Sequence, residues 1–325
     1  MDLNELKTLY RAVENPLDAY TLGQDPLVTS LVLGTPQLRQ MPSRQILKPI
    51  GVDSITFKWF SYGVERLKAY DTERALRAEI RHSDWTATTN TDSLKRYSWS
   101  VPKDVAELAN SHPSLRVAEL SARMARDIVM LNIEMLAATL LTTVTNYPVS
   151  HRLALGAGSE FDAAGGDSNA SIQTIVDAIC DDTGLQPMDL QVFLPNKSYR
   201  AALQDPVFRA IRGYQTTQIG NAATLAEYWG VGGVFTGNIR TADEDNAVSD
   251  LYGDVAIVFY PGMGADYDTT YGDQQFGATF SWNKGMALER WFDPKTTTWY
   301  FPWEEWVKHG IINSSCGGII TNCAA

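Results

Sequence analysis

A long uninterrupted run of helical periodicity in the middle of the chain constrains the fold more than any other feature. Apolar residues recur at helical spacing between positions 117 and 135, and Pro113 suits a first helical turn. No helix breaker follows until Tyr147-Pro148, because the residue before a proline disfavours the helical conformation. The pattern predicts one helix over residues 113–146, about 51 Å long at the rise of an α-helix.

The second half of this helix is apolar on nearly every side. After Ile128 its only charged residue is Glu134, and a helix that is apolar all round is normally buried. We therefore expect sheet to cover this half on more than one side. The predicted helix is unusually long, since the mean helix has only about 11–12 residues. Its occurrence among strand-like segments indicates an α+β fold.

A long, highly charged excursion precedes the helix. Residues 55–60 have strand character, residues 84–91 are polar and turn-like, and residues 96–101 alternate as a returning strand. The excursion over 54–101 has few apolar residues to anchor it, and a solvated β-hairpin is only marginally stable alone. Its interspersed charges are typical of a solvent-exposed surface. Its length favours the alternative that it contacts a neighbouring subunit.

The first 50 residues have the pattern of an arm rather than of a domain. An apolar stripe predicts a short amphipathic helix that stops near Pro16, and further prolines prevent any long regular element. The stripe consists of Leu3, Leu6, Leu9, Tyr10 and Val13. Because such an arm cannot bury its own apolar residues, we expect it to pack against something else.

A compact α/β pattern follows the long helix and a Gly- and Ala-rich loop at 149–170. Apolar residues over 172–180 predict a helix that Gly184 ends, and Asp205-Pro206 has the form of an N-cap before a helix. Strands are expected at 190–194, 234–236 and 255–260. From residue 276 onward, apolar and polar residues alternate, which predicts further strands.

Five of the nine tryptophans lie in this last part of the chain: Trp282, Trp291, Trp299, Trp303 and Trp306. Aromatic strands build sheets, and they can also line a groove for carbohydrate or stacked bases. We favour core or interface filling, because the large area of tryptophan dominates packing.

No motif for catalysis, a cofactor or a metal is present in the sequence. The four histidines are isolated, and neither a zinc motif nor a complete dinucleotide or phosphate loop occurs. The cluster Asp243-Glu244-Asp245 could bind a divalent cation, but it lacks the EF-hand spacing, so a solvated loop is favoured. We expect a protein that is not an enzyme, with no catalytic residue, no cofactor and no metal.

Charge and hydropathy narrow the class of partner. The chain has 27 Lys and Arg against 38 Asp and Glu, a net charge of −11, which argues against a protein that wraps or reads nucleic acid. The most apolar stretch, 128–141, falls short of the roughly 20 residues of a bilayer span. We expect a soluble protein without a membrane partner.

The order of several short segments resembles the major capsid protein of tailed bacteriophages, in particular its lambda-type branch. The likeness covers about residues 50–310, and no single segment is diagnostic. The ordered set is the charged segment 70–80, Asn146-Tyr147-Pro148 after the long helix, and the segments 167–172, 184–187, 193–196 and 225–231.

This resemblance implies a Hong Kong 97-like capsid fold with a fixed division of the chain. Residues 1–53 would be the N-terminal arm and 54–101 the extended β-hairpin loop. The peripheral domain would comprise 102–170, with the spine helix at about 113–146, and the return strands at 276–310. The axial domain would be 171–275, and 311–325 would form a C-terminal tail, which we expect to be buried at a subunit contact.

The resemblance also implies a function. Copies would assemble as hexamers and pentamers into an icosahedral head that encloses double-stranded phage DNA, with Glu73, Arg74 and Arg77 pairing across subunits. The chain would be made in the host cytoplasm and end in the virion. No long charged N-terminal extension is present, so we expect a separate scaffolding protein, besides a portal and a decoration protein as further partners. An acidic inner wall would let the genome slide.

Two other functions compete with this interpretation. The same fold forms cellular encapsulin-type nanocompartments that hold enzyme cargo. A soluble α/β enzyme with an aromatic groove is an alternative from a different class.

Overall fold

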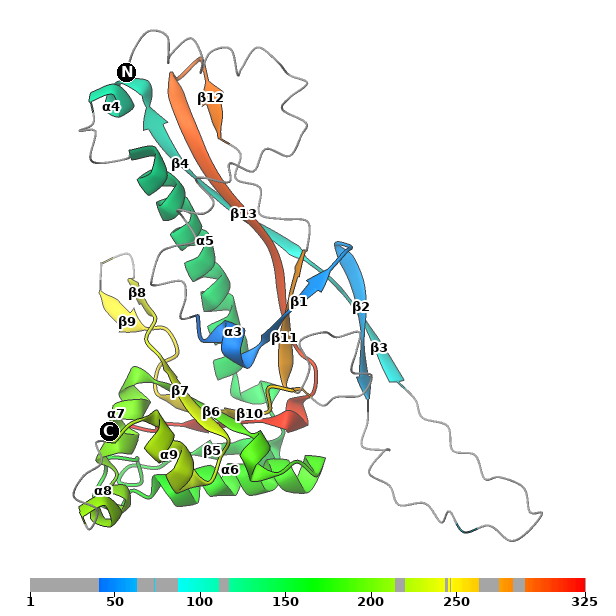
Figure 1. Ribbon diagram of the computed structural model, residues 1–325, viewed down its shortest axis with the longest axis vertical. Coiled ribbons are helices and arrows are strands. Elements are labelled where there is room, and N and C mark those ends of the chain that lie inside the picture. The colour runs from blue at the N-terminus through cyan, green and yellow to red at the C-terminus, as the bar shows by residue number, and fades with distance from the viewer. Residues whose placement is uncertain are drawn as a thin grey trace.

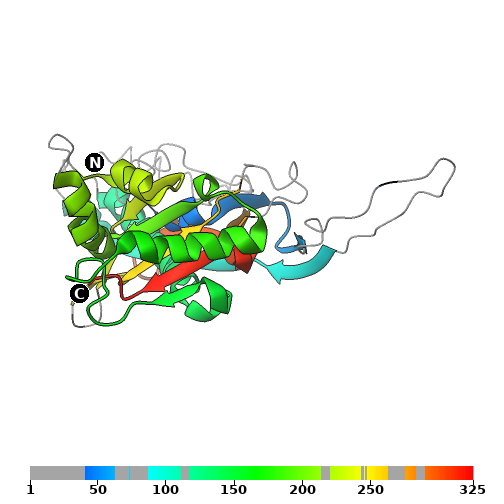
Figure 2. The ribbon, with the colours of Figure 1, turned by 90° about the horizontal axis from the view of Figure 1, so that it is seen from below.

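The structure is a computed structural model that describes residues 41–62, 73, 87–110, 117–213, 220–242, 245, 247–262, 275–282 and 290–324. It has an elongated region built along helix α5 and a compact region at one end of that helix (Figure 1). Each region contains one five-stranded sheet. The hairpin of strands β2 and β3 projects to one side of the body (Figures 1 and 2).

The elongated region packs α5 (Val117–Thr142) against one face of a sheet in the order β1-β11-β13-β12. Strand β4 pairs along the other edge of β13, and β1 is the only parallel strand of these pairs. Alternate residues of β13, namely Phe301, Trp303 and Val307, are buried towards α5. The strands are β1 (Lys48–Val52), β4 (Lys95–Asp104), β11 (Gly277–Trp282), β12 (Trp291–Asp293) and β13 (Thr298–Ile311).

The compact region holds the largest core of the molecule around a sheet in the order β5-β14-β10-β6-β7. All five residues of β10 are buried. Helix α6 lies across one face of the sheet (Figure 2) and contacts β14 and β10. The elements are β5 (Arg152–Ala154), α6 (Ser168–Thr183), β6 (Gln191–Pro195), α7 (Asn196–Gln204), α8 (Pro206–Gly213), α9 (Ala222–Trp229), β7 (Gly233–Gly237), β10 (Val255–Phe259) and β14 (Gly317–Thr321).

Local sequence signals set the limits of the compact helices as predicted. The Asp167 carboxylate accepts from the Ala170 amide at the start of α6, and Gly184 ends that helix with φ of 72°. The Asp205 side chain accepts from the amides of Val207 and Phe208, which confirms the predicted N-cap of α8.

The remaining described elements are short. They connect the two regions or lie at their edges. They are α3 (Ser43–Ile46), β2 (Thr56–Tyr62), β3 (Ala87–Ser93), α4 (Val105–Asn110), η5 (Val144–Asn146), η6 (Val149–His151), η7 (Pro187–Asp189), β8 (Arg240–Ala242), β9 (Val248–Asp250) and η8 (Ser314–Cys316).

The long helix ends four residues earlier than predicted. Residues 113–116 lie outside the described part, and α5 stops at Thr142, where Thr143 takes an extended conformation. The side-chain amide of Asn146 donates to the Leu140 carbonyl at 2.7 Å, and the Tyr147 hydroxyl donates to the Leu141 carbonyl at 2.7 Å. These side chains satisfy carbonyls that a further helical turn would have used, so the helix can stop before the proline.

The returning strand of the hairpin differs from the prediction. Strand β3 pairs with β2 from Thr56↔Ser93 to Tyr62↔Ala87, so part of the segment 84–91 is strand rather than turn. The predicted strand at 96–101 exists within β4, but its partner is β13. The threonines at 88, 89 and 91 favour strand in spite of their polarity. The hairpin therefore ends near residue 93 instead of 101.

The segment 311–325 is not a free tail that awaits another subunit. Its strand β14 lies inside the compact sheet, antiparallel to β10 and parallel to β5. Ile319, Ile320 and Cys323 are fully buried within the same chain. The expected burial at a subunit contact was therefore wrong, and β5 and β14 join the compact sheet from outside the predicted range 171–275.

Candidate assembly surface

The outward face of α5 carries a continuous row of apolar side chains. Leu120, Met124 and Met135 are 49%, 59% and 43% exposed, and Ile128 and Leu131 are half-buried. Their spacing of four, four, three and four residues places all five on one face of the helix. We call these five residues the α5 stripe.

The charged residues of α5 do not share this stripe. Arg126 and Glu134 are buried on the sheet side of the helix, and the Arg126 guanidinium lies 5.6 Å from the centre of the Trp303 ring. Burial lowers the pKa of Arg126, against the attraction of Asp127 and Glu305.

The buried face of the helix is mostly apolar, with Arg126 and Glu134 as its charged members. The α5 stripe adds a second apolar face, where an ordinary surface helix is polar or charged. The expected cover of its second half on more than one side is incomplete: Ala137, Ala138 and Leu141 join the core of the compact region, whereas Met135 and Leu136 are 43% and 41% exposed.

A buried polar network fixes α5 at the junction of the two regions. The Glu134 carboxylate accepts from the Ser43 amide at 3.1 Å, from the Ser43 hydroxyl at 2.5 Å and from the Tyr252 hydroxyl at 2.5 Å. Burial, with the nearby Glu134 carboxylate, raises the pKa of Tyr252 well above its ordinary value. The network ties α3, α5 and the compact region together, so the α5 stripe is presented in a fixed orientation.

The projecting hairpin is anchored only at its base in the described residues. Phe57 of β2 packs against Phe280 of β11, with ring centres 4.4 Å apart, and Leu94 is buried in the same cluster. Lys308 of β13 forms an ion pair with Asp92 of β3 at 3.4 Å. Phe57 and Leu94, with the half-buried Trp59 of β2, hold the base of the hairpin on the elongated sheet.

Of the three predicted interface residues, only Glu73 is among the described residues. Glu73 is exposed, while Arg74 and Arg77 lie outside the described residues. Their pairing across subunits stays a prediction. The α5 stripe was not among the predicted site residues, because the sequence shows an apolar helix without showing which side the sheet leaves open.

The tryptophans confirm the packing interpretation at several positions. Trp303 is fully buried beneath α5, and Trp282 meets Trp306 edge to face with ring centres 5.7 Å apart. Trp291 stacks on Tyr300 at 5.0 Å, and Trp99 on the edge strand β4 is 53% exposed. Most of these side chains contribute to the sheet core, and Trp99 adds exposed apolar surface to the elongated region.

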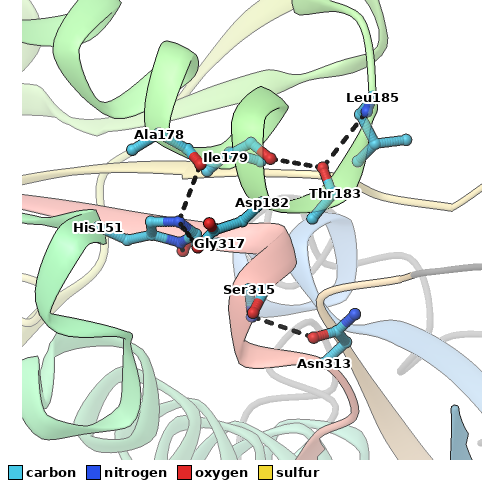
Figure 3. Close-up of polar contacts among 9 residues, drawn as sticks. All are labelled: His151, Ala178, Ile179, Asp182, Thr183, Leu185, Asn313, Ser315 and Gly317. Carbon is cyan, nitrogen blue, oxygen red and sulfur yellow. Dashed lines mark hydrogen bonds and ion pairs between the residues drawn. The ribbon is translucent and has the colours of Figure 1, made fainter. Parts of the chain in front are cut away.

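Two histidines, the buried His151 and the half-buried His309, have structural contacts at both ring nitrogens. For His151, Nδ1 lies 3.0 Å from the Gly317 carbonyl, and Nε2 lies 3.2 Å from the Ala178 carbonyl and 3.0 Å from Asp182 (Figure 3). This ring joins η6, α6 and β14. For His309, Nδ1 meets the Thr279 hydroxyl at 2.9 Å and Nε2 meets the Ile133 carbonyl at 3.2 Å.

A pocket of about 330 Å³ lies between α3 and the α5 side of the elongated sheet. Glu305 lines it, and burial raises the pKa of this carboxyl group while Arg44 and Arg126 lower it. Burial lowers the pKa of His309, at the same pocket, to about 4. Glu305 is the one carboxylate in the lining.

The described ranges contain no candidate metal site and no candidate membrane span. Within them, no group of three or more histidine, cysteine, aspartate or glutamate side chains could hold a metal ion. Of the cluster Asp243-Glu244-Asp245, only Asp245 is described. The helices of the same residues include none with the length and apolar character of a bilayer span.

Comparison with known proteins identifies the fold. No family model and no curated protein matches the chain. A phage-related protein from Bordetella bronchiseptica has a similar structure, with a TM-score of 0.69, 18% identity and coverage of 92% of this chain and 97% of that one. The capsid of cyanophage P-SCSP1u gives a TM-score of 0.56 at 10% identity, over 87% of each chain.

A third similar structure is the SrpI encapsulin of Synechococcus elongatus, with a TM-score of 0.50, 8% identity and coverage of 98% of this chain and 95% of that one. The arrangement of α5, the two sheets and the projecting hairpin is thus a Hong Kong 97-like shell fold. It is the fold of phage major capsid proteins, as the ordered segments of the sequence predicted.

Proposed function

We propose that this chain is the major capsid protein of a tailed bacteriophage. Copies assemble as hexamers and pentamers into an icosahedral head that encloses double-stranded DNA. The role is structural rather than catalytic, and the mature location is the virion. The fold supports this class of function, and the α5 stripe is the single observation that carries it.

The α5 stripe supports assembly because a soluble monomer rarely leaves such a row of large apolar side chains in water. Contiguous exposed apolar surface usually marks a contact with another molecule. The stripe is held rigidly by the Glu134 network, so it is ready to dock without reorganisation. The hairpin of β2 and β3, which the described residues anchor only at its base, offers a second contact with an adjacent copy.

The net charge of −11 supports a container more than a DNA-binding protein. A shell that is acidic overall repels DNA phosphates weakly and lets the genome move during packaging. Assembly of a closed head would use a separate scaffolding protein and a portal, with a decoration protein as an additional partner. Host cytoplasm is the expected place of assembly.

Gel filtration and negative-stain microscopy of the purified chain test the proposal. We expect capsomers from the chain alone, and closed shells when a scaffolding protein is co-expressed. Efficient closed shells from the chain alone would remove the need for a separate scaffold. A small discrete species with enzymatic turnover, and neither capsomers nor shells under any condition, would contradict the capsid function itself.

The similarity to an encapsulin favours one second candidate, a nanocompartment shell. The contents of particles purified from the native source separate the two functions. Nuclease-resistant double-stranded DNA inside the shell would support the phage head. A folded enzyme as cargo, with no enclosed DNA, would support the nanocompartment.

A further inference from the structure

The ring of His151 has hydrogen-bond acceptors at both of its nitrogens. Nδ1 lies 3.0 Å from the Gly317 carbonyl, and Nε2 lies 3.2 Å from the Ala178 carbonyl and 3.0 Å from the Asp182 carboxylate (Figure 3). A neutral imidazole has one N–H donor and one acceptor nitrogen, whereas the protonated ring has two donors. Only the protonated ring can therefore bond at both nitrogens, and a neutral ring must turn a lone pair towards an oxygen.

His309 lacks this constraint, although its ring also has contacts at both nitrogens. Its Nδ1 faces the Thr279 hydroxyl, which can donate, and its Nε2 faces the Ile133 carbonyl. A neutral ring with its proton on Nε2 satisfies both contacts. The partners of the two histidines thus favour opposite charge states, neutral for His309 and positive for His151.

His151 joins β14 to α6 at a point where strand pairing stops. It precedes β5, whose pairing with β14 begins at Arg152↔Ile319, so Gly317 lies beyond these pairs. The backbone of β14 approaches closely here, because a Cβ atom added at Gly318 would overlap the Ile175 side chain and lie 3.1 Å from the His151 carbonyl oxygen. The ring therefore bridges the start of β14 and the C-terminal half of α6.

The charge around the ring is mainly negative. The elements around it, α6, β5, η8 and β14, carry these titratable or charged side chains: Asp177, Cys180, Asp181, Asp182, Arg152 and Cys316. Asp182 is the one with a described contact to the ring, and the Arg152 guanidinium is directed to the Thr145 and Tyr147 carbonyls instead. The C-terminus of α6 adds partial negative charge and has no basic residue in its last turn. Because the ring is fully buried, its positive charge depends on these contacts.

We propose that His151 is a proton-dependent clamp that holds the start of β14 on α6. With the ring charged, Nδ1 donates to the Gly317 carbonyl, and Nε2 donates to the Ala178 carbonyl and the Asp182 carboxylate. With the ring neutral, the carboxylate keeps the remaining proton on Nε2, and the contact with Gly317 opens. Histidine changes charge between pH 5 and 8, so the clamp is closed at the acidic end of this range and open at the other. This device goes beyond the proposed shell function and does not depend on it.

Nitrogen NMR of the ring tests its charge directly. The full chain is labelled with ¹⁵N-histidine, and spectra are recorded from sedimented protein, which gives signals from monomers, capsomers or shells alike. The His151 signals are assigned by elimination with the variants His82→Gln, His112→Gln and His309→Gln. We expect protons on both His151 nitrogens at pH 5.5 and on Nε2 alone at pH 8. A single ring proton at pH 5.5, or two at pH 8, would overturn the proposal.

Hydrogen exchange measures the hold on β14. Amide protection of the peptide that spans β14 is compared at pH 5.5 and pH 8, after correction for the intrinsic pH dependence of exchange. The peptide over α9 is the reference, because this helix lies in the same region and has no described hydrogen bond to His151. We expect the protection of β14 to fall about tenfold at pH 8, as for one lost hydrogen bond, and that of α9 to stay the same.

Matched aspartate variants show whether the charge on the ring controls this change. Asp182→Asn removes the carboxylate that contacts the ring, and the fold should tolerate it because the side chain is 49% exposed. At pH 5.5 this variant should have a neutral ring and the β14 protection that wild type has at pH 8. Asp181→Asn removes the same charge from an adjacent exposed position with no described contact to the ring, and it should behave like wild type.

Two results of the exchange experiment would overturn the clamp. One is equal β14 protection at both pH values in wild type, and the other is an equal effect of Asp182→Asn and Asp181→Asn. Shell formation enters none of these measurements, so every outcome leaves the capsid function to its own test.

Discussion

The compact region and the α5 region of this chain bury their apolar residues in opposite ways. In the compact region every residue of β10 is buried, and β14 completes the sheet from within the same chain. In the α5 region the sheet covers one side of the helix, and the α5 stripe remains exposed on the other. The compact region is a finished folding unit, whereas the α5 region is half of a packed layer. Substitutions in the two regions should therefore separate folding from assembly.

The largest loss of folding stability is expected in the compact region. Ile320→Ala removes a fully buried side chain from β14 and leaves a cavity, so the free energy of unfolding should fall by about 3–4 kcal/mol. Urea unfolding followed by tryptophan fluorescence measures the change. Val149→Ala, at an 81% exposed position of the same region, is the control and should have little effect. A loss below about 1 kcal/mol for Ile320→Ala would show that β14 is not part of the core.

Acid should weaken the α5 region through His309. Burial lowers the pKa of this histidine from 6.5 to about 4, so the folded state prefers the neutral ring. Stability is then complete above pH 6.5 and is lost as the pH falls towards 4, by about 2–3 kcal/mol. Unfolding of wild type and of His309→Gln at pH 7 and pH 4 measures the difference. An equal pH dependence in both proteins would contradict the assignment.

The polar link between the regions should contribute somewhat less. Tyr252→Phe removes one of three donors to the buried Glu134 carboxylate and should cost about 2 kcal/mol, because hydrogen bonds to charged groups are strong. Tyr147→Phe removes a donor to a neutral carbonyl and should cost about 1 kcal/mol. Chemical unfolding compares the two variants. A smaller loss for Tyr252→Phe than for Tyr147→Phe would contradict a strong hydrogen bond between Tyr252 and Glu134.

The smallest effect on folding is expected where the effect on assembly is greatest. Met124→Glu with Met135→Glu changes exposed positions of the α5 stripe and should alter unfolding by less than about 0.5 kcal/mol. The same variant should form no shells, because charge cannot enter an apolar contact without a partner. Sedimentation and microscopy measure assembly, with Met188→Glu as the control. Normal shells from the double variant would remove the α5 stripe from the assembly surface.

Local signals made much of the compact region predictable from sequence. The stripe in α6 and the Asp205 cap act within a few residues, and the structure has both. Strand β3 was missed because its threonines were taken as turn residues, although they suit a strand. The place of β14 was missed because strand pairing over more than 160 residues, as between Leu153 and Ile320, leaves no local pattern.

The candidate site was less accessible to sequence reasoning than the fold. The periodicity of α5 revealed a long apolar helix, but an apolar residue beneath a sheet and one beneath a neighbouring molecule leave the same pattern. Only the position of β4 and β13 shows that Met124 and Met135 face away from the sheet. The residues Glu73, Arg74 and Arg77 came from the resemblance, and their role stays a prediction.

The position of β14 has a consequence for the timing of biosynthesis. This strand is later in sequence than every other strand of the compact sheet, yet it lies between β5 and β10. Until residue 321 has left the ribosome, β10 and β5 keep open edges and the sheet cannot close. Because Tyr252 of this region holds Glu134 of α5, the helix is fixed in place only after that step. We therefore expect that a nascent chain cannot join a growing shell. Only subunits whose synthesis is complete would then be added to it.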